Sequence, residues 1–506
     1  MQKLTIEEMA NFCKRKGFAY PSSEIYGGFS GFWDFGHLGV ELKNNIKAEW
    51  WRFHVHQRDD IVGIDGSIIA HPKVWQASGH VQNFEDIMLR CSKCKQEIRA
   101  DHFIEEKLKI NVEGHKVNEI DDIIKKNKLK CPDCKSEFEK IEQFNLMFKT
   151  IIGPKEDKSS VSYLRPETAQ LIFADFKLVA DNARLKLPFG IAQIGKGFRN
   201  EISPRDFLFR CREFEMMELE YFVHPDKTKD CPFIQDVENE ELNFLTGEMQ
   251  EKKQNPEKIK VKSALAKHLI SEWHAYWLAT EQKWFVGLGA KQENFRVRQH
   301  LKKEKSHYAS DTWDLEYNFP FGWKELQGVA NRADFDLQQH IKASGKDLSL
   351  FDEETKKKIV PHVVAEPSQG VERAFLVFMF DSYLDDSKRG NIVLKLHPKL
   401  APVKLGVFPL VNKLENEAKK VYGSLKKDFS CIFDRSGSIG RRYARADETG
   451  IPYCITIDFD TLNDKSVTVR NRDDTKQVRV KVNELKDAIK KLLSNEAKFE
   501  SVGKLC

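Results

Sequence analysis

Apolar side chains recur with two different periods along the chain, and each period predicts a different kind of element. In residues 38–57 they follow a four-residue step, which marks one face of a helix, at Leu38, Leu42, Ile46 and Trp50. In residues 213–223 they alternate with polar side chains, as in a strand. This alternation directs two sets of side chains to opposite faces: Phe214, Met216, Glu218, Glu220 and Phe222 to one, and Glu215, Met217, Leu219 and Tyr221 to the other.

The remaining segments have other sequence patterns, which predict other kinds of element. Residues 187–224 as a whole predict a strand, a loop and a second strand. Residues 225–299 predict an inserted helical subdomain, packed by an aromatic stripe at helical spacing that consists of Trp273, Trp277 and Trp284. Residues 365–384 predict a loop that enters an apolar helix. After about residue 400, short strands alternate with lysine-rich helices, so we expect a separate α/β domain there.

Composition narrows the class of protein without naming an activity. The 506 residues include 82 lysines and arginines against 77 acids, a net charge of +5, and 41% hydrophobic residues. This balance predicts several folded domains rather than intrinsic disorder. The sequence has no apolar run of membrane-spanning length and no secretory signal at its start, so we expect a cytoplasmic protein with no membrane partner. A nucleic-acid partner would need local basic surface, for which Arg441, Arg442 and Arg445 are candidates.

Four of the ten cysteines form two CxxC pairs, Cys91 with Cys94 and Cys131 with Cys134. Thiolates two residues apart on a tight turn can share one ion, and two such turns complete a tetrahedral zinc site. The pairs are farther apart in the sequence than in most zinc ribbons, and an inserted excursion such as residues 107–130 could fill the gap between them. A redox pair or free thiols are the alternatives. With four cysteine ligands the zinc would be structural.

Three further segments carry charged groups suited to a phosphate or an amino acid. Residues 199–212 hold several arginines, whose guanidinium groups match phosphate geometry, although an exposed charged hairpin would also explain them. Glu167 follows Pro166 in a turn, and Glu366 precedes Pro367 and a helix that begins near Arg373; both carboxylates could simply mark helix starts. No GxxxxGK[ST] motif is present, so any ATP site is not a P-loop.

Taken together, these segments resemble the class II aminoacyl-tRNA synthetases, and among them the glycyl-tRNA synthetases of the homodimeric type. GFWDFGHLGVELKNNIKAEWW is similar to motif 1 of the class, FRNEISPRDFLFRCREFEMMELE to motif 2 and EPSQGVERAF to motif 3. SGHVQNFEDIM, RADHFIEE, YLRPETAQ and GWKELQGVANRADFDL resemble further stretches of the family. The departures, which are His37, Leu171, Gln327 and Asn331, affect no residue to which the resemblance assigns chemistry.

The resemblance implies an α+β fold, with an antiparallel sheet of six strands as catalytic core. The core would comprise residues 1–90, 150–224 and 300–398, with a zinc-binding insertion at 91–149 and the helical insertion at 225–299. An anticodon-binding α/β domain would occupy residues 400–506. The reaction would join glycine to ATP, with magnesium, and then pass glycine to its tRNA.

The resemblance also implies a role for particular residues. The catalytic set would be Arg199 at the α-phosphate, Arg373 at the γ-phosphate, and Glu201. ATP would be held by these three and by Asn200, Phe209, Arg210, Cys211, Arg212, Glu213, Phe214 (beneath the adenine), Glu325 (the magnesium carboxylate), Leu326, Gly370, Val371 and Glu372. Glycine would be bound by Arg99, Glu167, Phe214, Glu215, Met216, Met217, Glu218, Glu366, Pro367, Ser368, Gln369 and Gly370.

Three other classes of protein compete with this interpretation. A non-catalytic relative would lack the motif 2 and motif 3 arginines, whereas Arg199 and Arg373 are both present. A class II synthetase for another amino acid would need a specificity pocket for a side chain, and the paired carboxylates favour glycine instead. A zinc-ribbon nucleic-acid-binding protein would leave the ordered motifs unexplained.

Overall fold

The structure is a computed structural model, and it describes residues 4–110, 112, 115–154, 160–301, 304 and 310–506. Parts of the predicted domains, such as residues 1–3 of the core and 111 and 113–114 of the insertion, lie outside the described residues. Within the described part of the chain, no helix is both long enough and apolar enough to cross a membrane.

Within those residues the largest sheet has nine strands in the order β13-β12-β14-β15-β16-β19-β11-β10-β3. The strands are β3 (Ile61–Ile64), β10 (Phe189–Phe198), β11 (Glu213–Val223), β12 (Glu241–Leu245), β13 (Glu257–Lys260), β14 (Phe295–Gln299), β15 (Asp311–Phe319), β16 (Gly322–Asn331) and β19 (His362–Gly370). In this described sheet, the six neighbours from β14 to β10 are antiparallel. The expected antiparallel core is confirmed, with β12 and β3 added in parallel at its two sides.

Helices α2 (His37–Trp51), α10 (Glu272–Gly287) and α12 (Val371–Ser382) belong to the main hydrophobic core behind the sheet. The predicted face of α2 is buried, as Leu38, Leu42, Ile46 and Trp50 are at most 5% exposed. The helix continues as a π-helical turn over Arg52–His56, which completes the predicted span. On the other face, α7 (Ala169–Ala183) packs against β10 and β11 through Phe176, Phe189 and Phe222. Strand β11 therefore has a different environment on each side, as its alternation predicts.

Residues 225–299 differ from the helical insertion expected from their sequence. They contain α8 (Gly247–Glu251), α9 (Val261–Ala266) and α10, but their strands β12, β13 and β14 extend the main sheet. The sequence does not reveal these short edge strands because their partners for hydrogen bonding lie elsewhere in the chain. The aromatic stripe is confirmed as core, since Trp273, Trp277 and Trp284 are at most 3% exposed.

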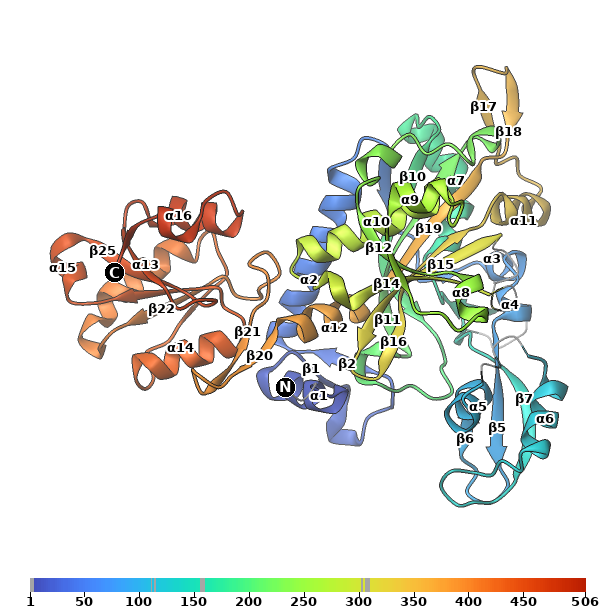
Figure 1. Cartoon of the computed structure of the whole chain (residues 1–506), viewed down its shortest axis with the longest axis horizontal. Coiled ribbons are helices and arrows are strands. Elements are labelled where there is room, and N and C mark those ends of the chain that lie inside the picture. The colour runs from blue at the N-terminus through green and yellow to red at the C-terminus, as the bar shows by residue number, and fades with distance from the viewer. Residues whose placement is uncertain (1–3, 111, 113–114, 155–159, 302–303, 305–309) are drawn as a thin grey trace.

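The segment expected as a zinc-binding insertion forms a small sheet and two helices at the lower right of Figure 1. Its elements are β5 (Glu85–Cys91), β6 (Glu97–Arg99), β7 (Phe138–Asn145), α5 (Ala100–Leu108) and α6 (Val117–Lys126). Apolar residues of these elements make a separate core, which includes Leu89, Phe103, Ile104 and Ile120. The long stretch between the cysteine pairs is thus filled by folded structure.

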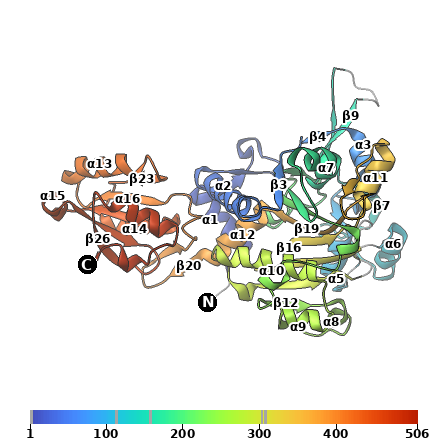
Figure 2. The same cartoon turned by 90° about the horizontal axis from the view of Figure 1, so that it is seen from above.

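The C-terminal residues form a second α/β unit, which Figures 1 and 2 show beside the main body. Its sheet has the order β23-β22-β24-β25-β26-β27, with strands β22 (Leu405–Pro409), β23 (Cys431–Phe433), β24 (Tyr453–Ile457), β25 (Ser466–Asn471), β26 (Gln477–Lys481) and β27 (Lys504–Leu505). Its main helices are α13 (Glu415–Leu425), α14 (Ile439–Glu448) and α16 (Leu485–Leu493). The α/β pattern is confirmed. Of the basic residues noted in α14, Arg442 is only 3% exposed and donates to main-chain oxygens, so it is structural.

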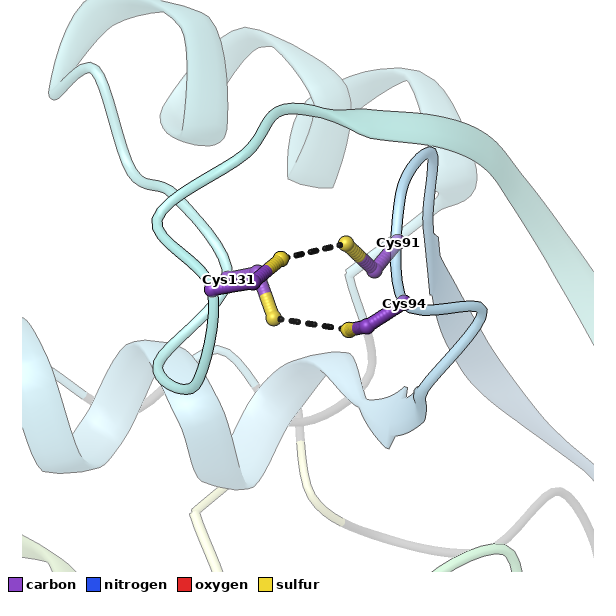
Figure 3. A group of neighbouring side chains, drawn as sticks. Cys91, Cys94 and Cys131 are labelled. Carbon is purple, nitrogen blue, oxygen red and sulfur yellow. Dashed lines mark hydrogen bonds between the residues drawn. The ribbon is translucent and has the colours of Figure 1, made fainter.

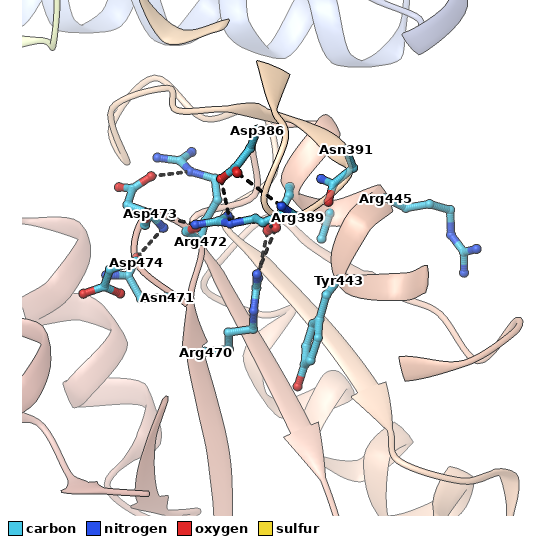
Figure 4. A network of polar contacts seen from close by, with 12 residues as sticks. Asp386, Arg389, Asn391, Tyr443, Arg445, Arg470, Asn471, Arg472, Asp473 and Asp474 are labelled. Atoms are coloured by element: carbon cyan, nitrogen blue, oxygen red, sulfur yellow. Dashed lines mark hydrogen bonds and ion pairs between the residues drawn. The ribbon is translucent and has the colours of Figure 1, made fainter. Parts of the chain in front are cut away.

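A hairpin formed by β20 (Tyr383–Asp386) and β21 (Asn391–Leu394) joins this unit to the main body. Arg389 in its turn pairs with Asp386 and reaches Asp447 of α14 at 3.2 Å (Figure 4). The same guanidinium donates to the main-chain oxygen of Arg472 at 2.7 Å. Arg470 makes a bidentate pair with Asp447 at 2.8 and 2.9 Å, so one carboxylate is shared by both arginines.

Candidate active site and metal centre

The site-facing side of β11 and β19 brings together two of the residues that were predicted to bind the substrate glycine. Glu218 lies opposite Ser368 in the strand register, and its carboxylate accepts a hydrogen bond from the Ser368 hydroxyl at 2.6 Å. The main-chain N–H of Thr168 also donates to Glu218 at 2.6 Å. The turn at residues 165–168 is therefore fixed against the sheet by Glu218.

Glu366 lies beside this pair and is held by a residue that the sequence analysis did not assign. Arg332 donates to both oxygens of Glu366, at 2.8 and 2.9 Å, and to both oxygens of Asp336, at 2.6 and 2.8 Å. Burial raises the pKa of Glu366 to about 8, because the charge of Arg332 does not compensate for burial and for the neighbouring charges of Glu167 and Glu218. The spacing of Arg332 and Asp336, four residues apart, is the signal that could have revealed this pair.

Glu167 is the third carboxylate of the site. Its oxygens lie 3.3 Å from Nε2 of His80 and accept from the Gln170 amide at 3.2 Å. Burial raises the pKa of Glu167, but the charges of His80, Arg332 and Arg199 outweigh it and hold the pKa below its ordinary value. His80 had not been predicted, since its sequence position gives no sign of a partner so far along the chain.

Arg199 lies just beyond the end of β10 and faces the same region. Its Nε donates to the main-chain oxygen of Pro166 at 3.1 Å. Its guanidinium carbon lies 5.4 Å from the ring centres of both Phe84 and Phe214. The ring of Phe214, which was expected to lie beneath the adenine, is thus covered by Arg199. The main-chain N–H of Asn200 donates to Leu146.

Arg373 is on the first turn of α12, at the other end of the site. Its Nη1 donates to the main-chain oxygen of Glu325 at 2.9 Å and lies 3.3 Å from the Glu325 carboxylate. The guanidinium also stacks on Phe209, 4.6 Å from the ring centre. The side chain of Glu325 is half exposed, and although desolvation by its surroundings raises its pKa, the charges of Arg373, His300 and Arg199 lower the pKa overall. Arg199 and Arg373, the two arginines predicted to bind phosphates, therefore both lower the pKa of Glu325.

Several predicted residues lie away from this face. Glu215 and Glu372 bind Lys43 of α2, at 2.8 and 2.6 Å, in a buried ion-pair cluster. Four others belong to the apolar core, namely Cys211, Met217, Leu326 and Val371. Pro367 and Gln369 are buried between the site-facing positions of β19. Any contact of these residues with a substrate would be through main-chain atoms. Met216 and Gly370 lie on the site side of the strand pair, opposite one another.

The insertion contributes a charged cluster next to motif 2. Arg99 binds Asp86 at 2.9 Å and Asp101 at 2.7 Å, and lies 4.0 Å from Glu201. Arg99, which was expected to bind the substrate glycine, thus lies close to Glu201, which was expected to bind ATP. Two further motif 2 residues are placed by nearby contacts: Arg212 donates to the main-chain oxygen of Glu201 at 3.0 Å, and Glu213 pairs with Lys196.

The four cysteines of the CxxC pairs meet at the tip of the insertion, where Figure 3 shows the sulfur atoms of Cys91, Cys94 and Cys131 turned toward the middle of the group. The Sγ atoms are 3.4 Å apart for Cys91 and Cys134 and 3.6 Å apart for Cys94 and Cys131. All four lie within 4.8 Å of one another. A disulfide needs a far shorter separation, about 2.05 Å. Zinc–sulfur bonds of about 2.3 Å place tetrahedral ligands roughly 3.8 Å apart, so the group fits a zinc ion.

Comparison with known proteins agrees with this geometry. Residues 148–382 match the family described as "tRNA synthetase class II core domain (G, H, P, S and T)", and residues 404–492 match "Anticodon binding domain". A solved prolyl-tRNA synthetase from Cryptosporidium parvum has a similar fold, with a TM-score of 0.57 and 15% identity. That similarity covers 97% of this chain and 77% of the other.

Sequence relatives are closer. A glycine–tRNA ligase from Caldanaerobacter subterraneus is 45% identical over 98% of this chain and 99% of its own length. Glycine–tRNA ligases from Clostridium kluyveri and Acetivibrio thermocellus are 45% and 46% identical, each over 96% of this chain and 98% and 97% of their own lengths. The chain therefore belongs to the glycine–tRNA ligase family of class II aminoacyl-tRNA synthetases.

Proposed function

We propose that the chain activates glycine with ATP and then transfers it to its tRNA. One observation carries the proposal: three buried carboxylates, Glu167, Glu218 and Glu366, converge on a sheet face between Arg199 and Arg373. Such a site offers negative charge to an ammonium group and positive charge to phosphates on either side. The family relationship and the anticodon-binding match support both the amino acid and the tRNA partner.

Glycine suits this site because it has no side chain to accommodate. The carboxylates would bind its ammonium group. A substrate with an additional methyl group would have to displace charged groups that are held by partners, such as Glu366 by Arg332. Overpacking of a filled site costs about 1–3 kcal/mol. Alanine would therefore be rejected by crowding rather than by a dedicated pocket.

In the first step, a glycine carboxylate oxygen attacks the α-phosphorus of ATP. A new oxygen–phosphorus bond forms, the bond to the bridging oxygen breaks, and pyrophosphate leaves with the electron pair. Arg199 and Arg373 would stabilise the negative charge that develops on the phosphates. In the second step, a hydroxyl of the terminal tRNA adenosine attacks the glycyl carbonyl, and AMP leaves.

Magnesium would be held at Glu325, where it would neutralise phosphate charge. A Cβ atom on Gly328 would lie 3.9 Å from an oxygen of Asp314 and 3.9 Å from an oxygen of Glu325. Oxygens of two carboxylates therefore lie on the same side of the sheet at this position. Hard oxygen ligands of this kind are those that magnesium prefers.

Further parts of the proposal concern assembly. Zinc at the four cysteines would be structural. A homodimer is supported by the exposure of Ile25, Tyr26 and Phe29, which are 87%, 87% and 79% exposed in the segment that precedes α2. Apolar surface of this kind favours burial against a partner. Sedimentation of the purified protein would test this state. The cytoplasmic location and the predicted domain limits stay predictions.

The deciding experiment is ATP–pyrophosphate exchange measured with each amino acid separately. We expect exchange with glycine alone; exchange with alanine, serine or threonine instead would refute the proposal. Arg373→Ala should abolish exchange without unfolding the protein. Arg15→Ala, which removes an exposed arginine from α1 (Ile6–Lys16), serves as the matched control and should behave as the wild type.

A further inference from the structure

His102 of the insertion contacts the loop of motif 2 across the boundary between the two parts. It lies on the first turn of α5, and Nη1 of Arg210 is 3.1 Å from Nδ1 and 3.1 Å from Nε2 of its ring. A nitrogen that is equally close to both ring nitrogens cannot lie in the ring plane, because Cε1 between them would block it. An N–H of Arg210 is therefore directed at the face of the imidazole, a cation–π contact of the kind that arginine commonly makes with aromatic rings.

Both sides of this contact are held in place. On the insertion side, the Asp101 carboxylate accepts from the main-chain N–H of His102 at 2.7 Å, and Arg99 binds Asp101 in turn. On the motif 2 side, Nε of Arg210 lies 3.5 Å from the carboxylate of Glu201. The main chain of Arg210 pairs with Arg205 in an isolated bridge that closes the loop. The insertion therefore restrains the loop at Arg210.

The ring also has the right charge for this contact. Burial, together with the charges of Arg210 and Arg99, lowers the pKa of His102 to about 3 against the opposing effect of Asp101. A neutral imidazole presents an electron-rich face to a cation, whereas a protonated one would repel it.

We propose that His102 is a positioning residue for ATP, which holds Arg210 in the orientation that the nucleotide requires. The proposal rests on the proposed function, because only that function makes the loop of residues 209–214 part of an ATP site. It gives the insertion a part in substrate binding in addition to its own folding around the cysteines. A purely structural contact between insertion and core would leave nucleotide affinity unchanged.

The test is glycine-dependent pyrophosphate exchange with zinc-loaded, full-length variants. We expect His102→Ala to raise KM for ATP about three- to tenfold, as for the loss of one cation–π contact. KM for glycine and kcat should stay within about twofold of the wild type. Because a cation–π contact needs only an aromatic face, His102→Phe should restore the ATP affinity. His115→Ala, a histidine change elsewhere in the same insertion, should have no effect.

The possible outcomes separate clearly. An unchanged KM for ATP in His102→Ala, or equal impairment of His102→Ala and His102→Phe, overturns the proposal. A fall in kcat with both KM values unchanged also overturns it. If His102→Ala does not fold, His102→Phe is compared with His102→Asn. Only a result in which the Phe variant binds ATP normally and the Asn variant does not supports the cation–π contact. If the wild type itself shows no exchange with glycine, the proposed function fails instead.

Discussion

At the scale of single residues, the unequal titration of the site carboxylates shapes what the site can bind. Glu167 has a lowered pKa because cationic neighbours outweigh its burial, whereas burial raises the pKa of Glu366 to about 8. Arg332 contacts Glu366 but is shared with Asp336. Near neutral pH, Glu366 is therefore the carboxylate whose charge responds to its surroundings.

Glycine activation should consequently depend on pH through Glu366. The ammonium of glycine requires a carboxylate, and Glu366 gains its charge only as pH rises through about 8. We expect kcat/KM for glycine in pyrophosphate exchange to rise over that interval, since this parameter reports groups of the free enzyme. Glu366→Gln should be less active and should lose the rise. A wild-type profile that is flat between about pH 7 and 9 would contradict this role for Glu366.

Arg332 provides a second prediction at this scale. Its side chain is buried and binds two carboxylates, so Arg332→Ala leaves both without a counter-ion. Breaking a buried pair in this way costs about 3–5 kcal/mol of the free energy of unfolding. Chemical denaturation should show this loss. Lys358→Ala removes an exposed pair with Asp347 and is the control, for which we expect a change below about 1 kcal/mol.

At the scale of elements, regular local patterns were predictable and partners distant in sequence were not. The alternation in β11 correctly separated Glu218 and Phe222 from Met217 and Tyr221. The segment before α12 was wrongly predicted to be a loop, because Pro367 and Gly370 argue against a central strand. In the structure it is β19, whose partners β11 and β16 come from other parts of the chain. His80, and the contact of Arg332 with Glu366, escaped prediction for the same reason.

The cysteine insertion allows a prediction for a whole element. Cys91 lies at the end of β5, Cys94 lies in the turn to β6, and β6 ends at Arg99, so a metal held at the tip would stabilise the hairpin that carries Arg99 toward Glu201. We expect about one zinc per chain by elemental analysis, and less than about half an equivalent in Cys131→Ser. Cys506→Ser, which changes an exposed cysteine outside the group, should keep the metal.

Removing zinc with a chelator should also expose residues 91–149 to limited proteolysis before the rest of the chain, because their core is small and would lose the link between the two cysteine pairs. Full zinc content in Cys131→Ser, or uniform cleavage along the chain after chelation, would show that the cysteines hold no structural metal.

At the scale of the whole molecule, Arg389 makes several contacts between the β20–β21 hairpin and the C-terminal unit. The turn between β20 and β21 inserts this side chain against Asp447 and the main chain of Arg472 and Asp473. Arg472 in turn donates to the main-chain oxygen of Leu396 at 2.8 Å. The sequence predicted a boundary near residue 400 but gave no sign of these contacts across it.

We expect Arg389 to set the orientation of the anticodon-binding unit relative to the active site. In Arg389→Ala, Asp447 keeps its bidentate pair with Arg470, so the unit should stay folded. Glycine-dependent pyrophosphate exchange needs no tRNA and should be unchanged, whereas KM for tRNA in aminoacylation should rise at least about fivefold, a typical coupling between two sites. Lys388→Ala alters an exposed neighbour in the same turn and should leave both assays unaffected. Equal tRNA KM values in Arg389→Ala and the wild type would mean that the orientation is fixed by the remaining contacts, such as the pair between Lys16 and Glu448.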